Sequence, residues 1–597
     1  MRSGAEPAPT AVVPRQRGTR PMLRRPTLRP VLGRPILAQP SAQRQPHGAY
    51  ADPIIWVTAF AMFGAYTAIS LSRLIQLNPT SWDLGIYTEY VKQYAHLRAP
   101  IVDIRAPGFN LLGDHFQPIV AVLAPFFRVF PSAATLLVGQ ALLAAASVFP
   151  VGHLAREKLG VGPSRAIAVA YGFSWGLQQL AQFDFHEIAF AVPLLAFSLC
   201  ALARGQTRAA VCWALPLVFV KEDQGFTVAA IGIYLVVAGL RAKVPAPGSR
   251  RDPEGRGRML AGQFLLIWGF AWSFVAIGLI IPHFNPAHQY QYWTDGGVLA
   301  PGGHPSVFGL VRQLLHAWPD KLQTLVMLLL PTAFIALRSP LALIAVPSLL
   351  LRFIATNSSF WGTYWHYNAT LMPILFVAAI DALARIGAAM DAADGTVDGA
   401  ADGAADGSVD GAAAGAAAGA ASRPADGAAA ETADGAADGA EAETADGAAA
   451  GSAGWASGRQ GPWRAAQAGA RRYGAAMMVA IAVPLAFQFP LSGLWNAATY
   501  RVSPHVTAAD AAMAKVPDGA TVLTTLDLLA PLAARTDTFW IGNNGNPQTQ
   551  YIVFDGVDSG YGSAVKNVPA FIASLYPPHT YTQIFSSGGV YVFRRTR

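Results

Sequence analysis

Five short polar clusters interrupt an otherwise apolar chain, and their side chains could carry out acid–base chemistry or bind a phosphate. In chain order they are Trp82-Asp83-Leu84-Gly85, Gly113-Asp114-His115-Phe116, Asp184-Phe185-His186-Glu187, Lys221-Glu222-Asp223 and Tyr364-Trp365-His366-Tyr367. Each lies at the end of an apolar run. An ionisable group near the centre of a spanning helix costs about 2.5–3.5 kcal/mol, so groups beside such helices usually line a polar site or pathway. The clusters therefore predict a functional site.

Asp83 has two interpretations. It can cap a helix that continues through Leu84. Alternatively it faces a cavity, where it would accept a proton from a sugar hydroxyl or help to hold a divalent cation. The candidate catalytic residues are Asp83, Asp114, His115, Glu187 and Glu222. The sequence leaves open whether a divalent cation takes part and which residues would bind it.

Cationic and aromatic side chains in the same clusters could bind a substrate. Lys221 could hold a phosphate or form an ion pair at a helix junction. Arg352, near the end of an apolar run, favours an anionic partner. His366 lies among aromatic residues, which are typical of a membrane interface and also stack on sugars. The candidate substrate-binding residues are Asp184, His186, Lys221, Asp223, Arg352, Trp365 and His366.

Other chemistries have no motif in this chain. We find no zinc-ligand spacing, nucleophile elbow, Walker loop, dinucleotide fingerprint or CxxC pair. Cys200 and Cys212 both lie in apolar runs, so no disulfide framework is indicated. Residues 542–547 have the composition of a turn, and we do not interpret them as a phosphate loop.

Composition indicates an integral membrane protein, because 53% of the 597 residues are hydrophobic and 13% are charged, against about 25% charged in a soluble domain. About eleven spanning helices are predicted, near residues 53–71, 132–154, 165–182, 187–203, 208–220, 224–240, 259–281, 322–337, 340–355, 366–386 and 474–495. The fold class is thus an α-helical polytopic membrane protein, in contact with the lipid bilayer.

The distribution of arginines predicts the orientation. Residues 1–50 contain nine arginines and one acid, Glu6. We interpret this tail by the positive-inside rule and expect no nucleic-acid partner. The apolar segment Pro118–Phe130 is short, and as a full span it would move the arginine-rich loop 241–258 outside. We therefore expect an interfacial or re-entrant helix within the outer loop 72–131. This count places all five clusters outside the cytoplasm.

The chain divides into five predicted parts. They are a disordered basic cytoplasmic tail (1–50), a multi-span membrane domain (51–387), a low-complexity Ala/Gly/Asp cytoplasmic linker (388–470), a last transmembrane helix (471–496) and an extracytoplasmic α/β domain (497–597). In the last part we expect helices at 508–516 and 564–576, the second broken at Pro569, and strands at 521–526, 539–541, 550–555 and 590–594. The linker is expected to be flexible.

The clusters resemble those of DUF2079, a family of bacterial membrane proteins. The matching segments are Asp83-Leu84-Gly85-Ile86-Tyr87, Gly113-Asp114-His115-Phe116-Gln117-Pro118, Phe185-His186-Glu187, Lys221-Glu222-Asp223, and residues 516–522 and 551–555. That family in turn is similar to the GT-C membrane glycosyltransferases. This second resemblance implies a polyprenyl-phosphate sugar donor, a cell-envelope acceptor, transfer at the outer face, and Asp83 as the acid of the first outer loop.

A transporter or flippase for a polar or lipid-linked solute is the alternative function. The same carboxylates and histidines would then relay protons or bind the solute. Transporters commonly contain internal repeats and broken helices near the middle of the membrane. Here the polar groups gather at one face and no repeat is visible, which favours the enzyme.

Overall fold

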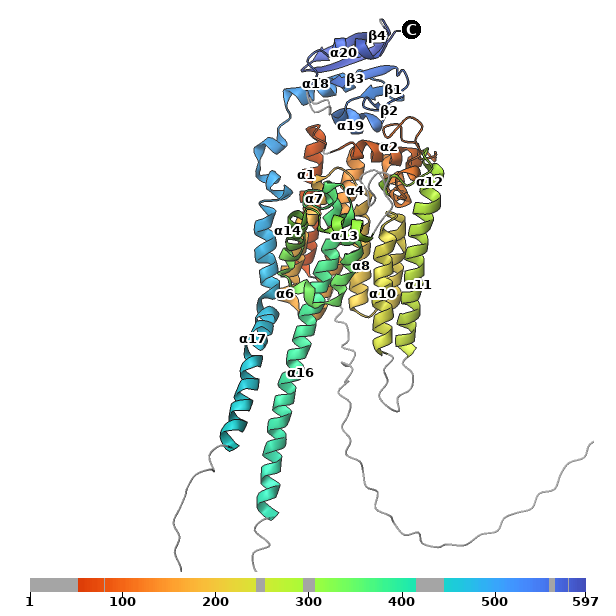
Figure 1. The fold of residues 1–597 in the computed structure, drawn as a ribbon. Coiled ribbons are helices and arrows are strands. Elements are labelled where there is room, and N and C mark those ends of the chain that lie inside the picture. Colours follow the sequence, from red (N-terminus) through yellow and green to blue (C-terminus); the bar gives the residue numbers. More distant parts are fainter. Residues whose placement is uncertain are drawn as a thin grey trace, which may run out of the picture. The chain divides into compact units, whose positions relative to one another are not determined.

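The computed structural model describes residues 52–79, 81–242, 253–293, 307–414, 445–557, 564–577 and 579–596 (Figure 1). The predicted basic tail, part of the arginine-rich loop 241–258 and residues 415–444 lie outside these ranges. Over the described residues the protein is mainly helical and ends in one five-stranded sheet.

Five helical segments of the described chain are long and apolar enough to cross a membrane: Pro53–Ile75, Ala133–Leu159, Gln224–Ala242, Glu254–Phe284 and His366–Ala392. Four shorter apolar helical segments are Pro118–Val129, Glu187–Ala203, Thr207–Phe219 and Pro340–Ile354. The protein is therefore a helical membrane protein with several candidate spans. The count of about eleven spans and the orientation of the termini stay predictions.

The helices before the linker follow in chain order. They are α1 (Pro53–Ile75), α2 (Asp83–Ala95), α3 (Ala124–Val129), α4 (Ala133–Ala146), α5 (Val148–Leu159), α6 (Val161–Gly172), α7 (Trp175–Gln182), α8 (Ala191–Ala203), α9 (Thr207–Ala214), α10 (Gln224–Ala242), α11 (Pro253–Val275), α12 (Ile281–Phe284), α13 (Val307–Leu315), α14 (Trp318–Leu329), α15 (Val346–Ile354) and α16 (Leu371–Ala414). Short 3-10 turns join several of them.

Three predicted spans are interrupted, which corrects the sequence-based boundaries. The span at 165–182 consists of α6 and α7, separated at Phe173–Ser174, and the amide of Gln178 donates to the freed carbonyl of Phe173 at 2.6 Å. The span at 322–337 ends as α14 at Leu329, because proline follows at 331 and Ala333 and Phe334 are left-handed. The span at 474–495 ends at Ala486.

Close backbone contact joins α10 and α11, which lie side by side in Figure 1. A Cβ atom at Gly232 would lie 2.6 Å from the carbonyl oxygen of Gly262. Only glycine allows this approach, which is typical of helix pairs in membranes. Since Ser273 near the end of α11 donates to the Glu222 carbonyl at 2.6 Å, the pair also fixes the turn that precedes α10.

The helix α16 continues into the tract that we expected to be flexible, as far as Ala414, and α17 (Ala445–Ala486) begins before the tract ends. An ion pair between Arg471 and Asp391 at 2.5 Å joins the two helices. Residues 415–444 lie outside the described chain, so the linker as a whole stays a prediction.

The C-terminal part contains the strands β1 (Thr521–Thr524), β2 (Asp537–Trp540), β3 (Tyr551–Asp555), β4 (Tyr581–Ser587) and β5 (Val590–Arg595), and the helices α18 (Pro504–Met513), α19 (Leu529–Ala533) and α20 (Val568–Leu575). The strand order is β2-β1-β3-β5-β4, with β1 parallel to β2 and β3, and β5 antiparallel to β3 and β4. The predicted strands are present with small shifts. The edge strand β4 was missed, and Pro569 lies in the first turn of α20 instead of breaking it.

The C-terminal domain contacts α2 and the segment that follows it. The ammonium group of Lys92 donates to the carbonyl of Thr536 at 2.6 Å, and the amide of Asn543 donates to the carbonyl of Ile104 at 2.8 Å. A Cβ atom at Gly85 would lie 2.9 Å from the Cβ of Leu529, so α19 packs tightly on the start of α2. These contacts fix the helix that begins at Asp83.

Candidate functional site

A cavity of about 300 Å³ lies between the start of α2, the segment that follows α2, the turn before α10, and α15. Eight of the twelve predicted site residues line it: Asp83, Asp114, His115, His186, Lys221, Glu222, Asp223 and Arg352. They come from parts of the chain that are more than 250 residues apart at the extremes. With Tyr367 of the fifth cluster, which also lines the cavity, the tertiary structure gathers all five polar clusters around one space.

The other four predicted residues lie beside the cavity. Glu187 and His366 are buried and contact its lining through Lys221 and His186. Asp184 accepts hydrogen bonds from the backbone N–H of Ser81 at 2.8 Å and from its hydroxyl at 3.4 Å. Trp365 packs edge-on against Phe183, with the ring centroids 5.3 Å apart. Asp184 and Trp365 therefore contact residues next to the cavity lining and not the cavity itself.

Glu222 is a fully engaged buried acid. One carboxylate oxygen contacts Nδ1 of His115 at 2.7 Å and accepts from the hydroxyl of Tyr290 at 2.8 Å. The other accepts from the backbone N–H of Phe116 at 3.1 Å. Charge-assisted hydrogen bonds of this kind are stronger than neutral ones. Glu222 therefore ties the 113–116 segment to the turn before α10.

Glu187 forms a second buried hub. Its carboxylate lies 3.0 Å from Nζ of Lys221 and 2.5 Å from Nδ1 of His186, and it accepts a hydrogen bond from the hydroxyl of Tyr87. The side chain is completely buried. Because a buried carboxylate needs such partners, Glu187 explains why a lysine can remain charged here.

The imidazole of His366 stacks on that of His186, with the ring centroids 3.7 Å apart. Neither ring nitrogen of His366 has a hydrogen-bond partner among the residues that the structure describes. His366 itself is 1% exposed. His366 is thus connected to the cavity through His186, and Tyr367 of the same cluster lines the cavity itself.

Asp83 does not cap α2, which rejects the first interpretation of this residue. Trp82 is the cap residue, and the hydroxyl of Ser81 accepts from the backbone N–H of Asp83 at 3.0 Å. The carboxyl group of Asp83 lines the cavity instead. Burial, together with the nearby charge of Asp184, raises the pKa of Asp83 to about 7. A carboxyl group with this pKa can accept a proton near neutral pH.

Arg352 offers a donor to the cavity. Its Nε donates to the carbonyl of Phe360 at 2.9 Å, and Nη1 donates to the carbonyl of Tyr367 at 3.4 Å. Its Nη2 is buried and has no hydrogen-bond partner within the described chain. A guanidinium held in this way can bind an oxyanion.

Several lining residues were not predicted from the sequence. Tyr292 stacks on His115 with ring centroids 4.2 Å apart, and Arg105 lies 3.5 Å from Asp114 and 5.6 Å from the ring of Trp82. Tyr87, Gln117 and Tyr290 complete this set. The aromatic segment 290–293 after an apolar run was a usable signal for the tyrosines, whereas nothing distinguished Arg105 from other loop arginines.

The cluster 113–116 begins with a glycine because no side chain fits at position 113. A Cβ atom there would lie 2.6 Å from the carbonyl group of Phe284. The amide of Asn285 donates to the carbonyl of Gly113 at 2.8 Å. The end of α12 therefore rests directly on the backbone that presents Asp114 and His115 to the cavity.

These features define a helical membrane protein with a buried, charged cavity. The chain belongs to the DUF2079 family, described as predicted membrane proteins, whose model matches residues 73–396. The comparison with curated proteins gives no match.

Two solved structures of ArnT from Cupriavidus metallidurans are similar to the chain. One is bound to undecaprenyl phosphate, with 15% identity, and the other is in the apo state, with 14% identity. Each similarity covers 90% of this chain and 97% of that chain, with a TM-score of 0.44.

Proposed function

We propose that this protein is a membrane glycosyltransferase that moves a sugar from a polyprenyl-phosphate donor to a cell-envelope acceptor. The observation that carries the proposal is that Asp83, Lys221 and Arg352 line the same cavity. A base and two phosphate-binding cations are the groups that such a transfer requires.

The roles follow from the contacts. Asp83 accepts the proton of the acceptor hydroxyl while the hydroxyl oxygen bonds to the anomeric carbon of the sugar. The bond between that carbon and the donor phosphate breaks, and the polyprenyl phosphate leaves. Lys221 and the Nη2 group of Arg352 bind the phosphate oxygens, which gain charge as the bond breaks. The rings of Trp82 and Tyr292 provide faces for the sugar.

The charged side chains that line the cavity indicate whether a metal ion would fit there. The cavity lining contains the cations Arg105, Lys221 and Arg352, and the four carboxylates Asp83, Asp114, Glu222 and Asp223. A bound phosphate adds further negative charge. A divalent cation held by Asp83 or Asp223 together with phosphate oxygens would fit this set, because Mg²⁺ is commonly bound by one or two carboxylates and the substrate. Such a cation would neutralise the leaving phosphate.

The proposal places the cavity and the C-terminal domain outside the cytoplasm, with the N-terminus inside. The arginine distribution supports this orientation. A reporter fused after Arg597 should be active outside, and one inserted at about Gly411 should be active inside. A cytoplasmic reporter signal after Arg597 would contradict transfer at the outer face.

Donor binding can be tested with the full chain in liposomes. Native mass spectrometry should detect one polyprenyl phosphate per chain. The double variant Lys221→Met/Glu187→Gln removes the cation without leaving its buried partner charged, and should weaken lipid binding by at least tenfold. The matched single variant Glu187→Gln keeps Lys221 and should bind the lipid more tightly than the double variant. Equal binding by the wild type and the double variant would contradict the role of Lys221.

A transporter remains the second candidate, favoured by the interruptions between α6 and α7 and after α14, since transporters commonly contain broken helices. The same liposomes separate the two functions. Formation of a glycosylated acceptor from a radiolabelled polyprenyl-phosphate sugar supports the enzyme. Movement of the label across the bilayer without any new glycosidic bond supports the transporter.

A further inference from the structure

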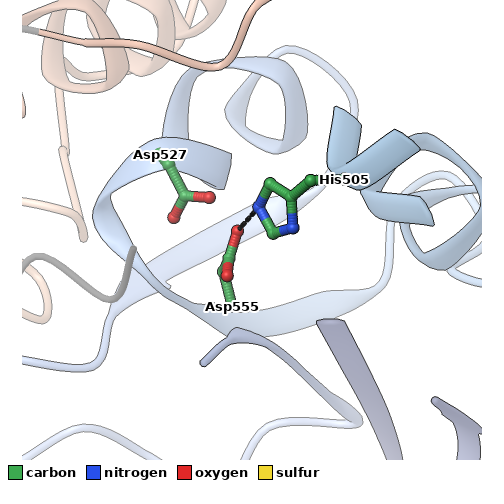
Figure 2. Close-up of side chains that lie close together, drawn as sticks. All are labelled: His505, Asp527 and Asp555. Atoms are coloured by element: carbon green, nitrogen blue, oxygen red, sulfur yellow. Dashed lines mark hydrogen bonds and ion pairs between the residues drawn. The ribbon is translucent and has the colours of Figure 1, made fainter. Parts of the chain in front are cut away.

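A second cluster of ionisable side chains lies in the C-terminal domain, outside the cavity. His505 in α18, Asp527 after β1 and Asp555 at the end of β3 each offer a ligand atom, and these atoms all lie within 4.8 Å of one another. Figure 2 shows the carboxyl group of Asp527 directed toward the pair formed by His505 and Asp555. Among the described residues, no other three histidine, cysteine, aspartate or glutamate side chains lie this close together.

The sheet topology explains how the three meet. The neighbouring strands β1 and β3 are parallel, so their carboxyl ends lie at the same edge of the sheet. After β1 the chain continues to β2, which pairs with β1 on the side away from β3. The point where the strand order reverses in this way is where open α/β sheets bind ligands. Asp527 and Asp555 follow β1 and end β3 at that edge.

The two acids differ in their partners. Asp555 is completely buried; one oxygen accepts from the backbone N–H of Val557 at 2.8 Å and the other lies 2.6 Å from Nε2 of His505. Asp527 is 5% exposed, its oxygens accept no hydrogen bond of standard geometry within the described chain, and its nearest ionisable neighbour is the carboxyl group of Asp555. A second buried carboxylate beside the first is costly unless a positive charge binds there.

His505 is oriented as a metal ligand would be. Its Nδ1 lies 2.8 Å from the carbonyl oxygen of Gly588, which can only accept, so Nδ1 carries the proton. Its Nε2 therefore faces the acids. Metal-binding histidines usually donate their other ring N–H to a carbonyl or carboxylate group, which fixes the tautomer. The side chain of His505 is 28% exposed, which gives a cation a route from solvent.

We propose that Nε2 of His505 and the carboxylates of Asp527 and Asp555 bind a divalent transition-metal cation, with Zn²⁺ and Mn²⁺ as the matching ions. One imidazole and two carboxylates suit these ions better than Ca²⁺, which takes six to eight oxygen ligands. Metal–ligand distances of about 2.0–2.2 Å place ligand atoms roughly 3–3.5 Å apart, so small side-chain rotations complete the site. Water supplies the remaining position.

The cation would stabilise the contact between the C-terminal domain and the membrane domain. Asp527 lies in the turn that leads into α19, and α19 packs on the start of α2 through Leu529 and Gly85. Fixing this turn fixes the surface on which α2 rests. The proposal is independent of the proposed transferase activity, because no residue of the cavity takes part.

The test uses the full chain, purified in detergent without a polyhistidine tag and dialysed against chelator. Titration calorimetry with Zn²⁺ and with Mn²⁺ should show binding to the wild type that Asp527→Asn weakens by at least tenfold. His505→Gln should weaken it similarly. Asp510→Asn, an exposed acid on α18, is the matched control and should bind as the wild type does. Asp83→Asn should also retain this binding, which separates it from any cation in the cavity.

Two results would overturn the proposal. The first is metal binding that is equal in the wild type, Asp527→Asn and His505→Gln. The second is no binding of either ion to the wild type at 0.1 mM, a concentration at which a structural site should be filled. Elution of each variant as the same single peak in size-exclusion chromatography shows that lost binding reflects the lost ligand and not unfolding. A rise in the unfolding temperature with Zn²⁺ or Mn²⁺ in the wild type alone further supports the site.

Discussion

Buried acids in the membrane domain and in the C-terminal domain differ in how fully they are bonded. Glu187 and Glu222 each have three ion-pair or hydrogen-bond partners. Asp527 accepts no hydrogen bond of standard geometry from the described residues and lies beside a second acid, Asp555. The carboxyl group of Asp83 opens to the cavity. Native proteins satisfy nearly all buried polar groups, so the exceptions indicate where a ligand binds. We infer that the satisfied acids hold the structure together and the others act on ligands.

The largest expected effect tests this distinction at Asp83. Asp83→Asn keeps the shape of the side chain and removes the base, so sugar transfer should fall by about 10²–10⁴-fold while folding persists. Transfer to a labelled acceptor in liposomes measures the rate. The control Asp103→Asn lies in the same segment, where Asp103 accepts from the backbone N–H of Gly108 at 2.7 Å, and should retain activity. Unimpaired transfer by Asp83→Asn would reject the catalytic role.

The pH dependence of transfer sharpens the same point. Because the pKa of Asp83 is raised to about 7, the base is protonated below that pH. The rate should fall by about tenfold for each pH unit below 7 and level off above it. The raised pKa also means that the folded state binds this proton more tightly than the unfolded state. Its contribution to stability is therefore present at low pH and lost as the pH rises toward 7, so Asp83→Asn should not be less stable than the wild type at pH 8. A rate that is constant between pH 5.5 and 8 would contradict the role of Asp83.

Replacing Glu222 should reduce stability more than activity, whereas replacing Asp83 should reduce activity more than stability. Glu222→Gln keeps the size of the side chain but loses the charge-assisted contact with His115, which should cost about 1.5–3 kcal/mol of stability. The unfolding temperature in detergent measures this loss. Transfer per folded molecule should fall less than in Asp83→Asn. If instead the variant were fully stable and as inactive as Asp83→Asn, the distinction between the two kinds of acid would fail.

The smallest effect is expected from the Ala/Gly/Asp tract. Deleting residues 395–450 leaves the Arg471–Asp391 ion pair between α17 and α16 in place and removes no residue of the cavity. Membrane insertion, measured by fractionation, and transfer should both stay close to the wild-type values. Loss of either would show that the tract has a role beyond linking two helices.

The fold could be predicted in outline because spanning helices and sheet strands leave local patterns. Long apolar runs gave α1 and α10 nearly at their observed bounds, whereas the span predicted at 259–281 is shifted by six residues at each end from α11. The breaks after Gly172 and Leu329 were missed because hydropathy remains high across them, while the carbonyl groups freed there are satisfied by distant or local polar groups. The edge strand β4 was missed because most of its side chains are exposed and it lacks an apolar alternation.

The sequence by itself determined the membrane class, the family motifs and the residue types of the cavity, because hydropathy and local spacing are properties of neighbouring residues. The tertiary structure alone decided which acids are satisfied. His115 and Glu222 meet across 107 positions, and His505 and Asp555 across 50. Such pairs carry no local signal, since burial and partner choice are set by the packing of elements that are distant along the chain. For that reason the sequence left open whether Asp83 is a helix cap or a base. The structure decided this, because Trp82 is the cap residue of α2 and the carboxyl group of Asp83 lines the cavity.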